Sequence, residues 1–250
     1  MVTGSKARID ATKQLLAGRS LVDYSRSIST ILSSEERHVD LAHPLAVVTP
    51  TLDGDILAVL ALVDTAFTPR QLHGMLSRHS EDGIRRALRR LTSQGIVLDQ
   101  RAGNAYLYRL SRSHLAAEPI IALAQLRQTF LARLEDRLGS WAVAPVYGAI
   151  FGSVARGSMR TDSDIDLLLI RPDDVDRDRW DELVAQLTAD VTAWTGNDTR
   201  VLEFSESEVR RSGRQEPVLR DVVAHGLTVA GTADWLRQAL PAKEPNDARS

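Results

Sequence analysis

Two aspartates at the head of a long apolar run constrain the fold of this chain most. Asp164 and Asp166 stand on either side of Ile165, and the apolar run Leu167–Ile170 follows before Pro172. An apolar run of this length, ended by a proline, predicts a buried strand. Side chains two positions apart on a strand point to one face, so the two carboxylates should lie side by side. Like charges that close repel each other unless a cation lies between them.

A glycine-serine pair lies upstream of the aspartates. Gly152 and Ser153 directly follow the apolar run Val146–Phe151, which predicts another strand, and a polar turn follows them. Glycine lets the backbone approach a bound phosphate closely, and the serine hydroxyl can donate a hydrogen bond to it. Mg²⁺ takes oxygen ligands, usually one or two carboxylates together with substrate phosphates. The two segments together therefore predict a site for Mg²⁺ and a phosphate-bearing substrate.

The combined pattern resembles a known family. Gly152-Ser153, ten intervening residues and then Asp164-x-Asp166 are similar to the nucleotidyltransferase motif of the DNA polymerase beta superfamily, above all to its minimal nucleotidyltransferases. The resemblance covers the motif and, through the order of strands, the last half of the chain. It implies transfer of a nucleoside monophosphate from a nucleoside triphosphate to a hydroxyl of a protein or small molecule. Small helical toxins are among the protein acceptors in this family.

The resemblance also implies roles for individual residues. Asp164 and Asp166 would be catalytic and would bind Mg²⁺, with two metal ions expected. Gly152, Ser153, Arg156 and Ser163 would bind the nucleotide, although Arg156 could instead brace the loop.

Relatives carry a third carboxylate on a neighbouring strand, and Glu203 in Val201–Phe204 is the best candidate for a catalytic role there. The alternative is an edge-strand glutamate that faces water. Asp162 fits a turn better than a ligand position.

Residues 45–117 carry a second pattern. A short strand at Ala46–Val48 is expected before three helices over 52–66, 69–77 and 81–93, and strands at 96–100 and 106–110 follow around Gly103 and Asn104. Thr68 and Ser80 are suitable N-caps for the second and third helices, and Gly95 ends the third. This order of elements resembles a winged helix-turn-helix domain.

Arginines concentrate in the same segment. Residues 70–115 carry a net charge of +6, whereas residues 1–69 carry −2 and residues 116–250 carry −6. Guanidinium groups suit phosphate oxygens, so the segment is a candidate double-stranded DNA-binding surface. The candidate nucleic-acid-binding residues are Arg85, Arg86, Arg89, Arg90, Arg101 and Arg109. The alternative is a solvated face on a docking module, and Glu81 and Asp82 at the start of the third helix disfavour contact with DNA.

The predicted fold class is α/β (α+β): a helical winged helix-turn-helix domain followed by a polymerase-beta-like domain with a mixed sheet and helices on one side. The predicted divisions are a helical arm over 1–44, the winged helix over 45–117, the nucleotidyltransferase domain over 118–240 with a connecting helix over 119–138, and a disordered tail over 241–250. The arm is expected to pack or to form a homodimer.

Composition excludes several classes of protein. The chain has no cysteine, so it forms neither disulfides nor thiolate metal sites. Its six histidines lack the spacing of zinc ligands, and its longest apolar runs are too short to span a bilayer. A cytoplasmic protein is expected, either a nucleotidyltransferase or a DNA-binding regulator whose nucleotidyltransferase fold only binds nucleotide.

Overall fold

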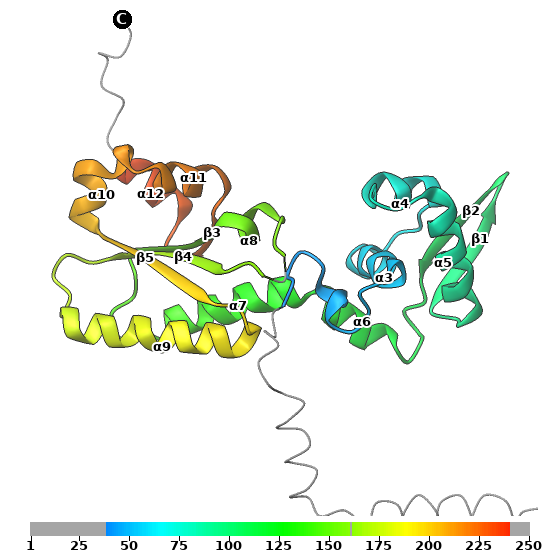
Figure 1. Ribbon diagram of the computed structural model, residues 1–250, viewed down its shortest axis with the longest axis horizontal. Helices are drawn as coiled ribbons and strands as arrows, with labels where there is room; N and C mark the ends of the chain where they lie inside the picture. Colours follow the sequence, from blue (N-terminus) through cyan, green and yellow to red (C-terminus); the bar gives the residue numbers. More distant parts are fainter. Residues whose placement is uncertain (1–38, 161, 241–250) are drawn as a thin grey trace, which may run out of the picture. The chain divides into compact units, whose positions relative to one another are not determined.

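The computed structural model describes residues 39–160 and 162–240 (Figure 1). Residues 1–38 of the predicted helical arm and the predicted disordered tail 241–250 lie outside the described residues. In the first half of the described chain the elements are η1 (Pro44–Val47), α3 (Leu52–Leu62), α4 (Pro69–Met75), α5 (Glu81–Ser93), β1 (Val97–Ala102), β2 (Ala105–Leu110) and α6 (Ala117–Ala124).

Helices α3, α4, α5 and α6 and an antiparallel hairpin surround the first core. The Thr68 side chain accepts from the backbone N–H of Gln71, and the Gln71 side chain accepts from that of Thr68, so a capping box starts α4. The Ser80 hydroxyl accepts from the backbone N–H of Gly83 at the start of α5. These caps satisfy backbone donors that helix starts leave free, and they explain why both helices begin where the sequence predicts. The winged-helix assignment itself stays a prediction.

Three local predictions in this region are wrong. The run Ala46–Val48 is not a strand, because Pro44 starts the 3₁₀ helix η1 there. Helix α3 ends at Leu62 and leaves Val63 exposed. The single helix predicted over 119–138 is two helices, α6 and α7 (Leu126–Gly139), that meet at Gln125. Ala117 and Ala124 of α6 join the first core, whereas α7 joins the second.

The second half contains a four-stranded mixed sheet. Its remaining elements are β3 (Tyr147–Phe151), α8 (Gly152–Arg156), β4 (Ile165–Arg171), α9 (Arg177–Thr195), β5 (Thr199–Ser205), α10 (Glu206–Ser212), η2 (Gly213–Gln215), α11 (Pro217–His225), β6 (Leu227–Ala230) and α12 (Ala233–Ala239). The strand order is β5-β4-β3-β6. Strands β4 and β5 run parallel, and β3 is antiparallel to both β4 and β6. The mixed sheet is as predicted.

Helices cover both faces of this sheet, so the expectation of helices on one side is wrong. Along β4, Ile165, Leu167 and Leu169 pack with α7 and α9, whereas Leu168 and Ile170 pack with α10, α11 and α12. Figure 1 shows these two groups of helices on opposite sides of the strands. The strand is apolar at every position from Leu167 to Ile170 because both of its faces are buried.

Two short helices were not expected from the sequence. Helix α8 occupies part of the segment read as a polar turn, and α12 follows β6. The Thr232 hydroxyl accepts from the backbone N–H of Trp235 and so caps α12. No helix of the described residues is long and apolar enough to cross a membrane.

Candidate active site

The glycine-serine segment begins a helix against the aspartate pair. Gly152 has φ +69°, a left-handed conformation that strains side chains other than glycine. A Cβ atom built on Gly152 would collide with Oδ2 of Asp166. Phe151, the residue before Gly152, pairs with Asp166 across β3 and β4. The backbone therefore approaches the Asp166 carboxylate more closely than any residue with a side chain would allow.

The two aspartates lie close enough to interact. Asp166 is the second residue of β4, and Asp164 precedes the strand by one residue. Burial raises the pKa of Asp166 above its usual range, and repulsion from the Asp164 carboxylate raises it further. Arg200 and Arg156 oppose this shift. The two carboxylates therefore repel each other, as their spacing predicts, and the two arginines offset part of this repulsion.

Two arginines hold helix α8 in place. Arg127 of α7 donates to the carbonyl oxygens of Val154 and Ala155, at 3.1 and 3.3 Å. Arg156 Nη1 lies 3.4 and 3.3 Å from the two carboxylate oxygens of Asp221 on α11. Arg156 thus braces α8 against α11, and its charge still lowers the pKa of Asp166. Both functions considered for this side chain are compatible with its position.

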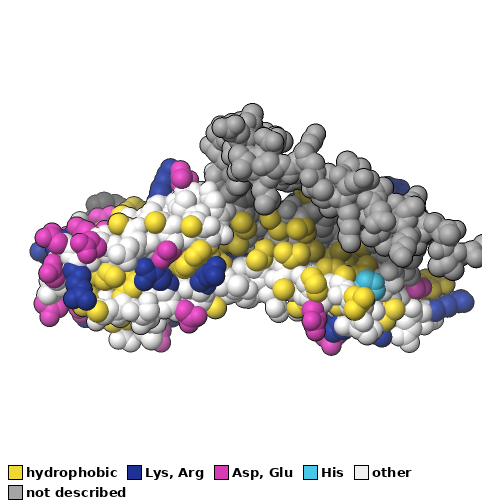
Figure 2. Space-filling view, turned by 90° about the horizontal axis from the view of Figure 1, so that it is seen from below, with side chains coloured by type: hydrophobic (Ala, Val, Ile, Leu, Met, Phe, Trp, Pro, Cys, Tyr) yellow, Lys and Arg dark blue, Asp and Glu magenta, His cyan; other side chains and the backbone are white. Residues whose placement is uncertain are grey.

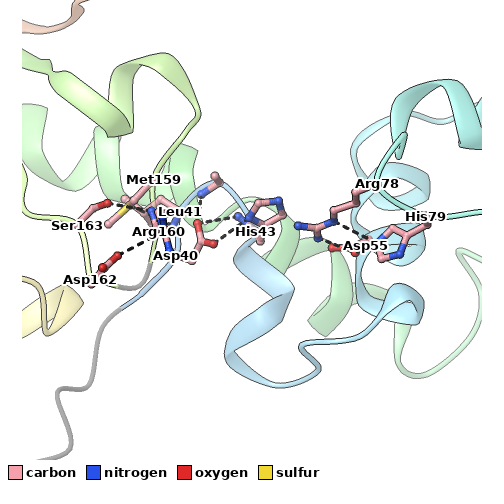
Figure 3. Close-up of polar contacts among 11 residues, drawn as sticks. Asp40, Leu41, His43, Asp55, Arg78, His79, Met159, Arg160, Asp162 and Ser163 are labelled. Carbon is pink, nitrogen blue, oxygen red and sulfur yellow. Dashed lines mark hydrogen bonds and ion pairs between the residues drawn. The ribbon is translucent and has the colours of Figure 1, made fainter.

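A tight turn precedes Asp164. The Ser163 hydroxyl accepts from the backbone N–H of Arg160 at 3.0 Å, and the exposed Asp162 side chain lies in the turn, 3.7 Å from Arg160 (Figure 3). The Ser163 hydroxyl accepts a hydrogen bond within the turn and can still donate one, so its assignment to nucleotide binding stays a prediction. Asp162 lies where a turn residue is expected.

A buried asparagine fixes this turn, and sequence reasoning missed it. Asn197 is fully buried and donates from Nδ2 to the carbonyl of Ser163 at 3.0 Å. Its Oδ1 accepts from the backbone N–H of Val39 at 3.0 Å. Leu41 also donates to the sulfur of Met159 (Figure 3). Asn197 thus links the turn before Asp164 to Val39, which lies more than 100 positions away in the sequence. No local sequence pattern predicts this link.

Glu203 does not meet the aspartate pair. It is in register with Leu169, which packs on the α9 side of the sheet, whereas Asp166 shares the alternation of Leu168 and Ile170. The indole N–H of Trp180 on α9 donates to its carboxylate, and Arg177 lies 3.8 Å from it. Glu203 is therefore neither an edge-strand glutamate that faces water nor a neighbour of the proposed catalytic aspartates. Its carboxylate satisfies a buried donor on the opposite face.

Comparison with known protein families gives a match in this half of the chain. Residues 132–220 match the family model described as the nucleotidyltransferase domain. That stretch contains Gly152, Ser153, Asp164 and Asp166. The match supports a nucleotidyltransferase fold and indicates transferase chemistry.

Solved structures also give partial matches. A toxin-antitoxin crystal structure with AMP-PNP is 18% identical with a TM-score of 0.31, and covers 45% of this chain and 79% of its own. The MntA-HepT toxin-antitoxin structure is 17% identical with a TM-score of 0.30, covering 45% and 82%. A tri-AMPylated HEPN toxin with MNT antitoxin from Shewanella oneidensis is 16% identical with a TM-score of 0.28, covering 46% and 82%. No curated protein gives a match.

The donors present fit a divalent metal ion that also binds substrate. Among the described residues, no three His, Asp or Glu side chains gather into a group that could hold a metal ion. Asp164 and Asp166 supply two carboxylates that repel each other, which is the donor set Mg²⁺ takes when phosphates complete its coordination. Asp164 and Asp166 are therefore the residues that would hold the metal.

Several arginines of the first half form ion pairs that neutralise part of the positive charge. All of the six proposed for nucleic acid are exposed, as predicted for a binding face. However, Arg90 binds both carboxylate oxygens of Asp53 at 3.0 and 2.9 Å, and Arg85 pairs with Glu81. Arg101 donates to the carbonyl of Gly103.

Further ion pairs reduce the charge of this segment. Arg78 and His79 both contact Asp55 (Figure 3), and Arg112 contacts Asp64. Asp53, Asp55 and Asp64 lie outside the basic segment in sequence, which is why counting charge along the chain overstated the positive field.

Proposed function

We propose that the chain is a nucleotidyltransferase that transfers a nucleoside monophosphate from a nucleoside triphosphate to a hydroxyl of a protein or small molecule. One observation carries this proposal: a segment that matches the nucleotidyltransferase domain sets a glycine backbone directly against one of two mutually repelling carboxylates. In-line attack on the α-phosphate needs positioning and charge neutralisation more than covalent help from the protein.

Each residue has a place in this scheme. The Gly152 backbone and the Ser153 hydroxyl would bind the β- and γ-phosphates, and Asp164 and Asp166 would hold Mg²⁺. When bound, Mg²⁺ supplies charge neutralisation for the phosphate oxygens. Arg156, kept beside Asp166 by Asp221, would lower the negative charge that develops on the phosphates. Glu203 has no part in the reaction, because its carboxylate is bound to Trp180 on the other face.

The test uses nucleoside triphosphates labelled at the α-phosphate, Mg²⁺, and cellular proteins and small molecules as acceptors. The chain should transfer label, and Asp164→Asn or Asp166→Asn should abolish the transfer. Glu203→Gln is the matched control, since it changes a carboxylate on the neighbouring strand and should retain the activity. Equal transfer by the aspartate variants would contradict the proposal.

A DNA-binding regulator is the second candidate. The observation in its favour is a basic face on α5 and the hairpin, where Arg86, Arg89 and Arg109 are exposed and have no acidic partner within the described residues. A cleft of about 720 Å³ lies between this hairpin and the starts of α4 and α5, lined in part by Arg70, Arg85, Tyr106 and Tyr108.

Retention of duplex DNA at several salt concentrations tests this candidate. Replacing both Arg86 and Arg89 by alanine should weaken binding and flatten its salt dependence by about 0.9 in slope for each phosphate that is no longer neutralised. Arg90→Ala is the control, because Asp53 already neutralises that guanidinium and the change should have a smaller effect. DNA retention together with nucleotide binding but no label transfer would favour the regulator.

A further inference from the structure

An exposed arginine contacts the aspartate pair from the next strand. Arg200 of β5 is in register with Asp166 across the parallel β4–β5 pair. Its Nη2 atom lies 2.7 Å from Oδ2 of Asp164. The Arg200 side chain is 73% exposed, whereas that of Asp164 is 27% exposed. The guanidinium therefore reaches from solvent onto the less exposed carboxylate.

Arg200 supplies part of the positive charge that the aspartate pair needs. Its guanidinium pairs with Asp164, and its backbone lies in register with Asp166. A guanidinium and a divalent ion both need carboxylate oxygen lone pairs, so the two compete for Asp164. The Arg200 guanidinium is mostly exposed to water, which weakens the ion pair, so a more highly charged cation can replace it.

The backbone keeps the displaced side chain nearby. Residues 199–205 pair with β4 along their length, so the Cα atom of Arg200 stays beside Asp166 when the guanidinium leaves Asp164. A triphosphate brought to Asp164 and Asp166 with its metal ion places phosphate oxygens close to the same guanidinium. A planar guanidinium binds such oxygens through two parallel hydrogen bonds.

We propose that Arg200 is an exchangeable counter-ion: it occupies Asp164 in the free protein, yields it to the divalent metal ion, and then binds a phosphate of the incoming nucleoside triphosphate. This inference rests on the proposed nucleotidyltransferase function and adds a residue to its substrate site. The proposal predicts two opposite effects of removing Arg200, one on metal binding and one on nucleotide binding. An arginine that only binds phosphate would affect nucleotide binding alone. Removal of Arg200 should strengthen metal binding and weaken nucleotide binding.

Two binding measurements on the full chain test the proposal without any catalytic readout. Mn²⁺ binding in the absence of nucleotide is followed by electron paramagnetic resonance, and binding of a fluorescent ATP analogue is followed in saturating Mg²⁺. Arg200→Ala should bind Mn²⁺ about two- to fivefold more tightly, as expected when an exposed ion pair is removed. The same variant should bind the ATP analogue about tenfold more weakly, as expected when a charge-assisted hydrogen bond is removed.

Arg177→Ala is the matched control. Arg177 is also an exposed arginine and contacts an acid of β5, Glu203, but on the opposite face of the sheet. It should change neither affinity. Arg200→Gln, which keeps most of the side chain, provides a second variant and should reproduce both effects.

The outcomes separate the two proposals. Unchanged or weaker Mn²⁺ binding by both Arg200 variants, with normal binding by the unmodified chain, overturns the exchange while leaving the proposed function intact. Loss of ATP-analogue binding alone also overturns it, since a simple phosphate ligand would give that result. If neither the unmodified chain nor the variants bind Mn²⁺ or the ATP analogue, the proposed function fails with it.

Discussion

Replacing Gly152 by alanine should separate the stability of the fold from the geometry of the site. Gly152 has φ +69°, and a non-glycine residue in this conformation costs about 1–2 kcal/mol. The added Cβ atom would also collide with Oδ2 of Asp166. This oxygen is the end of a side chain that can rotate, so the collision should move the carboxylate and add little to the decrease in stability.

Gly157 offers a matched control at the end of the same helix. It follows α8 with φ +66°, and a Cβ atom built there has no neighbour within 4 Å. Gly157→Ala should therefore lower the unfolding free energy by the same amount, roughly 1–2 kcal/mol, through backbone strain alone. The difference between the two variants isolates the effect of the collision with Asp166.

Urea unfolding, Mn²⁺ affinity and label transfer are the three measurements. Both variants should show a similar decrease in unfolding free energy. Only Gly152→Ala should also lose Mn²⁺ affinity and transfer activity, the latter by about 100-fold, the usual effect of displacing a catalytic group by roughly 1 Å. If Gly152→Ala bound Mn²⁺ and transferred label as well as Gly157→Ala, the close approach of backbone and carboxylate would not be needed by the site.

Three further predictions concern residues around the site. Glu203→Ala should lower the unfolding free energy by about 1–3 kcal/mol in urea titrations, because the Trp180 N–H loses its acceptor, yet leave label transfer within about twofold. Because the folded protein raises the pKa of Asp166, the unfolding free energy of metal-free protein should fall as pH rises from about 4 through that raised pKa; Asp166→Asn should remove this fall. Asn197→Ala should weaken Mn²⁺ binding at Asp164, since the Ser163 carbonyl is no longer held, and Asn197→Asp, which keeps an oxygen toward Val39, should not restore it.

Much of the fold was predictable where local signals agree. Helix α5 has the bounds that the sequence predicts, and β3 begins one residue after the start of the predicted strand Val146–Phe151. Helix α5 begins at a residue with a physical reason to start it, because the Ser80 hydroxyl caps its first turn.

Errors arose where the outcome depends on tertiary contacts. An apolar pattern that continues past Gln125 does not reveal that α6 and α7 join different cores. The assignment of Glu203 failed for a related reason. Strand register decides the face of every side chain, and a shift of one residue reverses it. Nothing in Val201–Phe204 alone indicates that Glu203 pairs with Leu169 and faces α9.

Arg200 escaped prediction because the family resemblance points only to a third acid on β5. The residue in register with Asp166 is basic, and only the β4–β5 pairing brings it to Asp164. Asn197 escaped prediction because it follows Gly196 at the end of α9, where a polar residue is expected for local reasons. Both residues contact partners that lie far away in the sequence, so neither leaves a periodic signal.

Charge in this protein has to be judged by pairing in space rather than along the chain. Figure 2 views the molecule from the side of α9. Acidic and basic side chains lie intermixed at the left of this view. The same intermixing neutralises Arg90 through Asp53 on the first half and Asp164 through Arg200 on the second. The second pair has another carboxylate beside it, because Asp164 stands next to Asp166. One arginine cannot neutralise two carboxylates, so this pair retains a negative charge that favours exchange for a divalent ion.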